Sequence, residues 1–232
     1  MARATAPLWL PAAVALMRFG FRWRVEELAA TRARFREIWG EGRRPVLICA
    51  NHLTLLDSAV IAWALGSPWW YLRRFAALAW NVPERRNFAS SRLQRVLVYL
   101  MKCVPIERGS DRREVAATLD RLSYLLSRGE AVLIFPEGGR SRTGRIEREG
   151  GATYGAGRLV AATPGCRVVC VYLRGERQRT WSALPARGER FHVRLDVLEP
   201  ASSHRGLRRS LDLSRQVLDR LADMERSHLD AR

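Results

Sequence analysis

Short apolar runs alternate with longer amphipathic segments along the chain. Residues 45–50, 131–135 and 167–173 are nearly continuous apolar runs with the length of buried strands, and residues 191–198 alternate in polarity like a further strand. A strand that is apolar on both sides must be covered on both faces. The pattern therefore predicts an α/β fold with a mostly parallel sheet flanked by helices.

The segments between these strands follow the period of an α-helix. The predicted helices cover residues 24–39, 54–65, 93–101, 111–128, 152–162 and 207–224. Residues 69–76 are interpreted as a strand or buried segment, and residues 103–106 as a short strand. Residues 80–91 show no clear periodicity, and residues 136–151 are predicted to form a loop rich in Gly, Arg and Glu.

The chain before the first strand is interpreted as a helical extension. Residues 6–17 are nearly uncharged, but this stretch is shorter than the roughly 20 residues that a helix needs to cross a bilayer. Aromatic and arginine side chains between Trp9 and Arg24 suit a segment lying in the membrane interface, and packing on the domain is the alternative. The expected division is an N-terminal helical, membrane-facing segment (residues 1–43) and an α/β domain (residues 44–232).

Charge points to an anionic partner. The 232 residues include 40 basic and 23 acidic side chains, which gives a net charge of +17. Such an excess suits nucleic acid, anionic lipid, an acidic carrier protein or a phosphorylated substrate. The basic residues, nearly all Arg, are spread over almost every segment and form no basic-aromatic binding motif. We therefore expect no nucleic acid partner.

Cysteine usage favours a reducing compartment. The four cysteines are Cys49, Cys103, Cys166 and Cys170. They have no companion His/Cys pair at the spacing of a zinc site. We expect reduced core residues in the cytosol.

The leading candidate site follows the first apolar run, where residues 51–57 read Asn-His-Leu-Thr-Leu-Leu-Asp. Open α/β sheets build ligand sites at such strand-to-helix junctions. Residues five apart on one helix point about 140° apart, so His52 and Asp57 meet only if His52 lies in the turn and Asp57 in the first helical turn. The carboxylate can then accept the Nδ1 proton and leave Nε2 as a base. The structural alternative is a helix capping box, because Thr54 and Asp57 have its spacing.

Two more junctions follow apolar strands and are expected at the same edge of the sheet. Residues 106–109 supply the guanidinium of Arg108. Residues 135–142 supply a carboxylate, two glycines and a guanidinium, in the order Glu137, Gly138, Gly139 and Arg140. A glycine-rich turn beside arginine can bind a phosphate through its amides and a bidentate fork.

In this order the blocks resemble the glycerolipid acyltransferases of the PlsC type, which include the 1-acylglycerol-3-phosphate acyltransferases. The first block of that family, Asn-His-four residues-Asp, matches Asn51, His52 and Asp57. The third block, Phe-Pro-Glu-Gly-Thr-Arg-Ser, matches residues 135–141, with Gly139 in place of Thr.

The other two blocks match more loosely. The second block of the family ends a strand with an arginine, as residues 104–108 do. The fourth, Val-Pro-Val, corresponds to residues 169–171, where Cys170 replaces the proline. The resemblance covers roughly residues 44–200.

The resemblance implies transfer of a fatty acyl group from acyl-CoA or acyl carrier protein to the hydroxyl of a lysophospholipid. It makes His52 the general base and Asp57 the group that holds the imidazole tautomer. Residues implied in acceptor binding are Arg108, Glu137, Gly138, Gly139 and Arg140, the arginines as phosphate ligands. No metal and no tightly bound cofactor are implied, and the expected location is the cytoplasmic face of the membrane, as a peripheral or monotopic protein.

The two departures from the family pattern leave the acceptor open. Gly139 removes a hydroxyl and Cys170 removes a proline, so a lyso-ornithine lipid, another lysophospholipid or a specialised-metabolite alcohol are alternatives to 1-acylglycerol-3-phosphate. Two rival classes are a basic nucleic-acid-binding protein and a noncatalytic membrane-surface protein that keeps the fold.

Overall fold

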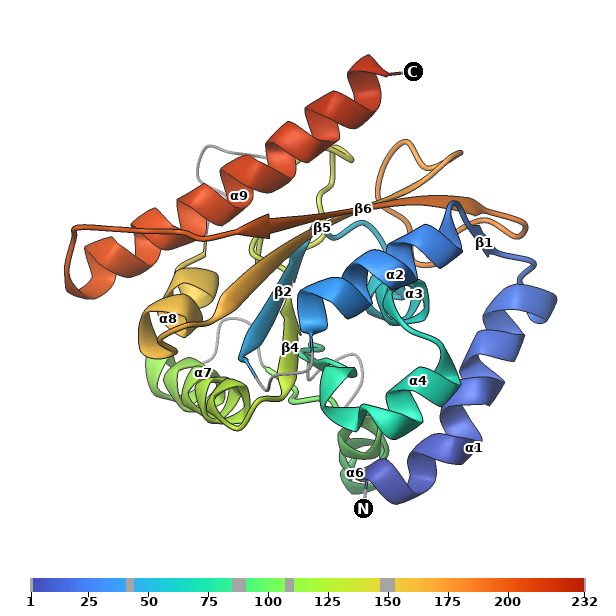
Figure 1. Ribbon diagram of the computed structural model, residues 1–232, viewed down its shortest axis with the longest axis horizontal. Helices are drawn as coiled ribbons and strands as arrows, with labels where there is room; N and C mark the ends of the chain where they lie inside the picture. The colour runs from blue at the N-terminus through green and yellow to red at the C-terminus, as the bar shows by residue number, and fades with distance from the viewer. Residues whose placement is uncertain (1, 41–43, 85–90, 107–110, 147–152, 232) are drawn as a thin grey trace.

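The computed structural model describes residues 2–40, 44–84, 91–106, 111–146 and 153–231. Within these residues a curled six-stranded sheet lies between two groups of helices (Figure 1). The strands are β1 (Arg24–Val25), β2 (Val46–Ala50), β3 (Trp80–Asn81), β4 (Ala131–Ile134), β5 (Arg167–Gly175) and β6 (Arg190–Leu198). Their order is β1-β6-β5-β2-β4-β3, and every pair is parallel except β5 with β6. The predicted mostly parallel α/β sheet is confirmed.

Helices cover both faces of this sheet. The described helices are α1 (Ala2–Ala15), α2 (Leu28–Trp39), α3 (Asp57–Leu65), α4 (Pro68–Arg73), α6 (Arg92–Leu100), α7 (Arg112–Ser127), α8 (Gly155–Ala162) and α9 (Gly206–Asp230). A π-helical turn, Leu16–Gly20, continues α1, and a 3₁₀ turn, Phe75–Ala77, follows α4.

Strand β2 is buried along its whole length because it lies between the two layers of helices. Ile48 and Ala50 join the hydrophobic cluster that includes residues of α1, α2, α3 and α4. Leu47 and Cys49 point the other way, into the cluster formed with α7, α8 and α9. Since β2, β4 and β5 are parallel neighbours, their carboxyl ends meet at one edge of the sheet. The loops that follow these strands therefore come together there.

The segment predicted as a strand or buried segment at residues 69–76 is helical, so the strand interpretation is wrong. Helix α4 begins after Ser67, whose side chain accepts a hydrogen bond from the amide of Trp70. Pro68 occupies the first turn of the helix, where its missing N–H costs nothing. The aromatic composition of the segment favours a strand, but the capping residue and the proline decide the local structure.

Several other predicted elements also differ in extent from the structure. The first long helix starts at Leu28 instead of residue 24, because β1 pairs with β6. Helix α3 starts at Asp57 instead of residue 54, since the preceding residues turn around its carboxylate. The predicted short strand at residues 103–106 is reduced to isolated bridges, Asn81 with Cys103 and Glu84 with Ile106.

The N-terminal helix packs against α4 and α6. Ala6, Leu10 and Met17 are buried in the cluster on that face of the sheet. Leu8 and Phe19, by contrast, point into solvent. No helix in the described part of the chain is both long and apolar enough to cross a membrane.

Helices α8 and α9 approach closely at Gly157. A Cβ atom added there would lie 1.9 Å from the carbonyl oxygen of Ser210, whereas one added at Gly155 would meet nothing closer than 3.6 Å. The Gly157 amide also donates to the hydroxyl of Ser214. This contact fixes α9 against α8.

We predict that Gly157→Ala lowers the free energy of unfolding by about 1–3 kcal/mol, because α9 must move away from α8. Gly155→Ala in the same helix is the matched control and should be neutral or slightly stabilising. Denaturant unfolding of both variants is the measurement. Equal stability of the two would contradict the close contact.

Candidate active site

The site begins where β2 ends. The buried side chain of Asn51 pairs with the backbone of Leu173 in β5: its Nδ2 donates to the carbonyl at 2.9 Å, and its Oδ1 accepts from the amide at 2.8 Å. A side-chain amide thus continues the strand pairing for one step after the ladder stops. The chain then turns away from the sheet with His52 at the beginning of the turn.

Asp57, the first residue of α3, organises this turn. Its Oδ2 accepts the amide protons of Leu53 at 2.6 Å and Thr54 at 2.7 Å, and its Oδ1 accepts from the Thr54 hydroxyl at 2.5 Å. Asp57 is 2% exposed, and a buried carboxylate is tolerated only when donors surround it. The turn therefore folds around the carboxylate.

The imidazole of His52 lies against the same oxygen. Its Nδ1 is 3.0 Å from Asp57 Oδ2, and its ring stacks on Phe135 with centroids 4.0 Å apart and planes 15° apart. An ionised carboxylate only accepts, so a neutral imidazole paired with it keeps its proton on Nδ1 and its lone pair on Nε2. The side chain remains 12% exposed. The structure thus has the arrangement that the five-residue spacing requires, with His52 in the turn and Asp57 in the first helical turn.

The capping interpretation describes part of the same geometry. Asp57 reaches back to the amide of Thr54, as the acidic residue of a capping box does. However, the residue before α3 is Leu56, and the Thr54 hydroxyl accepts from the Leu56 amide at 3.3 Å instead of capping the amide of Asp57. One carboxylate therefore both ends the turn and orients the imidazole.

The glycine-rich loop after β4 forms hydrogen bonds with both backbone groups of His52, its amide and its carbonyl. Glu137 Oε1 accepts the His52 amide proton at 3.1 Å, and the Ser141 amide donates to the His52 carbonyl at 2.9 Å. Gly138 has φ +66°, and a Cβ atom there would lie 2.5 Å from Thr153 Cγ2. Gly139 follows in the same loop and is half-buried. The predicted junctions after β2 and β4 are therefore in direct contact.

Arg140 extends from this loop to a partner that the sequence did not reveal. Its guanidinium carbon lies 5.0 Å from the ring centroid of Trp181, in the loop between β5 and β6. That loop also reaches the His52 turn: the Ser182 amide donates to the Leu53 carbonyl, and the Leu55 amide donates to the Ala183 carbonyl. In the sequence, the one sign that Trp181 has a role is that it is an aromatic residue in a polar loop. Only the fold brings it to Arg140.

Other candidate groups are placed as follows. Arg108 lies outside the described residues. The backbone amides of Gly138 and of the His52 turn already donate within the protein, Gly138 to the Phe135 carbonyl and the His52 turn to Glu137 and Asp57.

The cysteine thiols are not activated. All four are free, and burial raises the pKa of Cys103 and Cys170 to about 12 and that of Cys166 to about 11. Burial also raises the pKa of Cys49. A thiol with a raised pKa is neutral at pH 7 and a poor nucleophile. Among the described residues, no group of three or more His, Cys, Asp or Glu is arranged to hold a metal ion.

We predict that Asp57→Asn lowers the free energy of unfolding by at least about 2 kcal/mol, because the amide nitrogen must face a backbone or hydroxyl donor. His52→Gln should cost less than about 1 kcal/mol, since Asp57 keeps its three other donors. Denaturant unfolding of both variants tests this. Similar losses in the two would show that the turn does not depend on the carboxylate.

The segment that contains these site residues matches a known protein family. Residues 25–174, well over half of the chain, match the family described as Acyltransferase. No curated protein matches the chain. The matched segment contains His52, Asp57 and the loop from Glu137 to Arg140, and it ends at Arg174 in β5. The chain therefore belongs to the acyltransferase family.

Proposed function

We propose that the protein transfers a fatty acyl group from an acyl thioester, acyl-CoA or acyl carrier protein, to the hydroxyl of a lysophospholipid such as 1-acylglycerol-3-phosphate. The observation that carries this proposal is the contact between His52 Nδ1 and Asp57 at 3.0 Å, which leaves Nε2 as a base beside a partly open site. Family membership supports acyl transfer in general, and the donor and acceptor belong to the proposal.

In the proposed reaction, Nε2 of His52 removes the proton of the acceptor hydroxyl as its oxygen attacks the thioester carbonyl. The new C–O bond forms, the C–S bond breaks, and the proton passes from His52 to the departing thiolate. Asp57 stabilises the imidazolium that exists between these events. General base assistance of this kind is worth about 10²–10⁴-fold in rate. No acyl-enzyme is needed, because a thioester is already activated.

The acceptor headgroup is proposed to bind beside this base. The cation–π contact with Trp181 holds the Arg140 guanidinium in place, and its N–H groups would donate to phosphate oxygens. Glu137 and Gly138 shape the loop that carries Arg140. Arg108 keeps the phosphate-binding role that the resemblance implies.

An apolar cavity supports a fatty acyl substrate. It has a volume of about 130 Å³, and its lining includes Ser58 and Ala59, the two residues after Asp57. Leu10 of α1, Met17 of the π-helical turn and Tyr71 of α4 also line it. Dry cavities of about 150 Å³ bind molecules as large as benzene, so this one accommodates several methylene groups.

Other acceptors remain alternatives for the same chemistry. Gly139 and Cys170 depart from the family pattern, and a lyso-ornithine lipid or specialised-metabolite alcohol would need no phosphate ligand. A noncatalytic membrane-binding or nucleic-acid-binding role has weaker support, because neither explains a buried carboxylate held against a partly exposed imidazole.

We predict that the protein releases free thiol from acyl-CoA only when a lysolipid acceptor is added, and that His52→Ala lowers this rate at least about 10²-fold. The assay uses a panel that includes 1-acylglycerol-3-phosphate, other lysophospholipids and lyso-ornithine lipid. His204→Ala, which removes an exposed histidine before α9, is the control and should keep full activity. Activity of His52→Ala within a few-fold of the wild type would remove His52 as the base.

We also propose that α1, α4 and α6 bind the cytoplasmic surface of an anionic membrane. These helices lie together at one end of the molecule (Figure 1). Together with the π-helical turn that continues α1, they expose large apolar side chains to solvent: Leu8, Leu16, Phe19, Trp69, Leu93, Val96 and Leu97. Residues 2–20, 68–73 and 92–100 contain arginines but no Asp or Glu, although the whole chain has 23 acidic residues. An apolar surface with arginines and no acids is complementary to anionic lipid, where each Arg contributes about 1 kcal/mol.

We predict that Leu93→Ser with Leu97→Ser weakens co-sedimentation with phosphatidylcholine vesicles containing phosphatidylglycerol. Leu207→Ser on α9, at a comparably exposed site, is the control and should bind like the wild type. High salt should weaken binding further through screening. Point variants are preferable to deleting residues 1–23, which would also remove the buried Trp23. Unchanged binding of the double variant would exclude α6 from the contact.

A further inference from the structure

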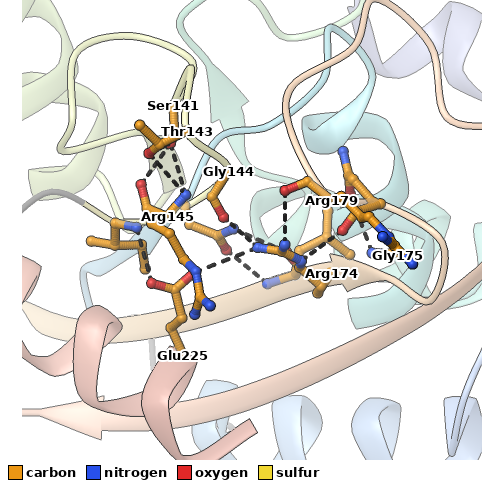
Figure 2. A network of polar contacts seen from close by, with 12 residues as sticks. Ser141, Thr143, Gly144, Arg145, Arg174, Gly175, Arg179 and Glu225 are labelled. Carbon is orange, nitrogen blue, oxygen red and sulfur yellow. Dashed lines mark hydrogen bonds and ion pairs between the residues drawn. The ribbon is translucent and has the colours of Figure 1, made fainter. Parts of the chain in front are cut away.

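A buried guanidinium lies behind the loop that carries Arg140. Arg174, at the carboxyl end of β5, is 6% exposed. Its three nitrogens donate to three backbone carbonyls: Nη1 to Gly144, Nε to Gln178 at 3.0 Å and Nη2 to Arg179 at 3.2 Å. Figure 2 shows the Arg174 guanidinium between the segment of Gly144 and the segment of Arg179. One planar fork thus joins the loop after β4 to the loop after β5.

The positive charge of Arg174 is balanced by a carboxylate on α9. Glu225, also 6% exposed, places Oε1 at 3.5 Å from Arg174 Nη1 (Figure 2). Its Oε2 accepts the amide proton of Ile146 at 3.0 Å. The carboxylate therefore holds the loop after β4 directly as well as through Arg174. Both partners are buried, so removing either leaves an uncompensated charge inside the protein.

The two loops also touch each other where the fork holds them. Gly144 has φ +73°, and a Cβ atom added there would lie 2.1 Å from the carbonyl oxygen of Arg179. Only glycine allows this approach. Gly144 lies within a turn closed by Ser141, whose hydroxyl donates to the Arg145 carbonyl at 2.6 Å and accepts from the Arg145 amide at 3.0 Å.

The two loops joined in this way carry the two partners of the contact between Arg140 and Trp181. Arg140 precedes the Ser141 turn, and Trp181 follows Arg179 by two residues. The backbone bonds of Ser141 to His52 and of Ser182 to Leu53 connect the same loops to the catalytic turn. A shift of one loop relative to the other would therefore separate Arg140 from Trp181 while leaving the bonds within the Asp57 turn in place.

We propose that Arg174 and Glu225 are positioning residues that hold Arg140 and Trp181 together as one acceptor-binding site, so that the C-terminal helix contributes to substrate recognition. This inference rests on the proposed acyl transfer to a phosphorylated lysolipid. Trp181 and Glu225 lie beyond the segment that matches the family, residues 25–174, so the acceptor site extends into sequence outside that segment. Lysine cannot replace Arg174, because one ammonium cannot reach three carbonyls arranged in a plane.

The test combines hydrogen–deuterium exchange with steady-state kinetics on Glu225→Gln and Arg174→Lys. Exchange in peptides covering residues 141–146 and 178–183 should speed up in both variants. The KM for 1-acylglycerol-3-phosphate should rise about tenfold, while kcat and the KM for palmitoyl-CoA stay within about twofold. Arg140→Ala gives the reference for a lost acceptor contact and should show the same split.

Arg220→Gln is the matched control. It breaks another contact between α9 and the sheet, with Asp196 of β6, and not one with the described residues of either loop, so exchange and both KM values should match the wild type. Gly144→Ala provides a second variant in which the loops are pushed apart without a change of charge, and it should reproduce the acceptor effect.

Two results would overturn the inference: unchanged exchange in both peptides, or faster exchange with equal effects on both KM values. The exchange measurement needs no substrate. If the wild type transfers no acyl group, the proposed function fails by itself, and the exchange data alone decide whether the pair holds the loops.

Discussion

The burial of the Asp57 carboxylate is the constraint on which the site depends. A carboxylate shielded from water requires donors, and residues 52–54 supply all four of them. The chain between β2 and α3 can satisfy the carboxylate only by wrapping around it, and this wrapping turns the His52 ring toward Oδ2. Asn51 fixes the start of the turn on β5, and Phe135 supports the imidazole ring from the loop after β4. The orientation of one imidazole therefore follows from the folding of the turn after β2 against β5 and the loop after β4.

The parts of the fold that the sequence predicts are those set by local patterns. Apolar runs identified β2, β4 and β5, because strands covered on both faces have no polar positions. The pairing of His52 with Asp57 was predictable because both residues lie within one turn. Helix α4 was not predicted, since its aromatic residues resemble a strand, although Ser67 followed by Pro68 is a helix-start signal that could have identified it.

The rest of the site depends on contacts between distant segments. Trp181 is one aromatic residue in a polar loop, and nothing local links it to Arg140. Arg174 and Glu225 are equally hidden, since arginine is frequent throughout the chain and an acidic residue on an amphipathic helix usually faces solvent. The family match has the same limit, because it ends at Arg174 before the loop and the helix that complete the network. Only the three-dimensional structure brings Trp181, Arg174 and Glu225 together with the loop that carries Arg140.

The central claim is that Asp57 holds His52 with its proton on Nδ1 and its lone pair on Nε2. Nitrogen-15 NMR of histidine-labelled protein tests it directly, with the His52 signals assigned by their loss in His52→Gln. Above the usual titration range of histidine, the account predicts a protonated Nδ1 and a bare Nε2 for this residue. A proton on Nε2 under the same conditions would contradict it, because the imidazole would then have no base to offer the acceptor hydroxyl.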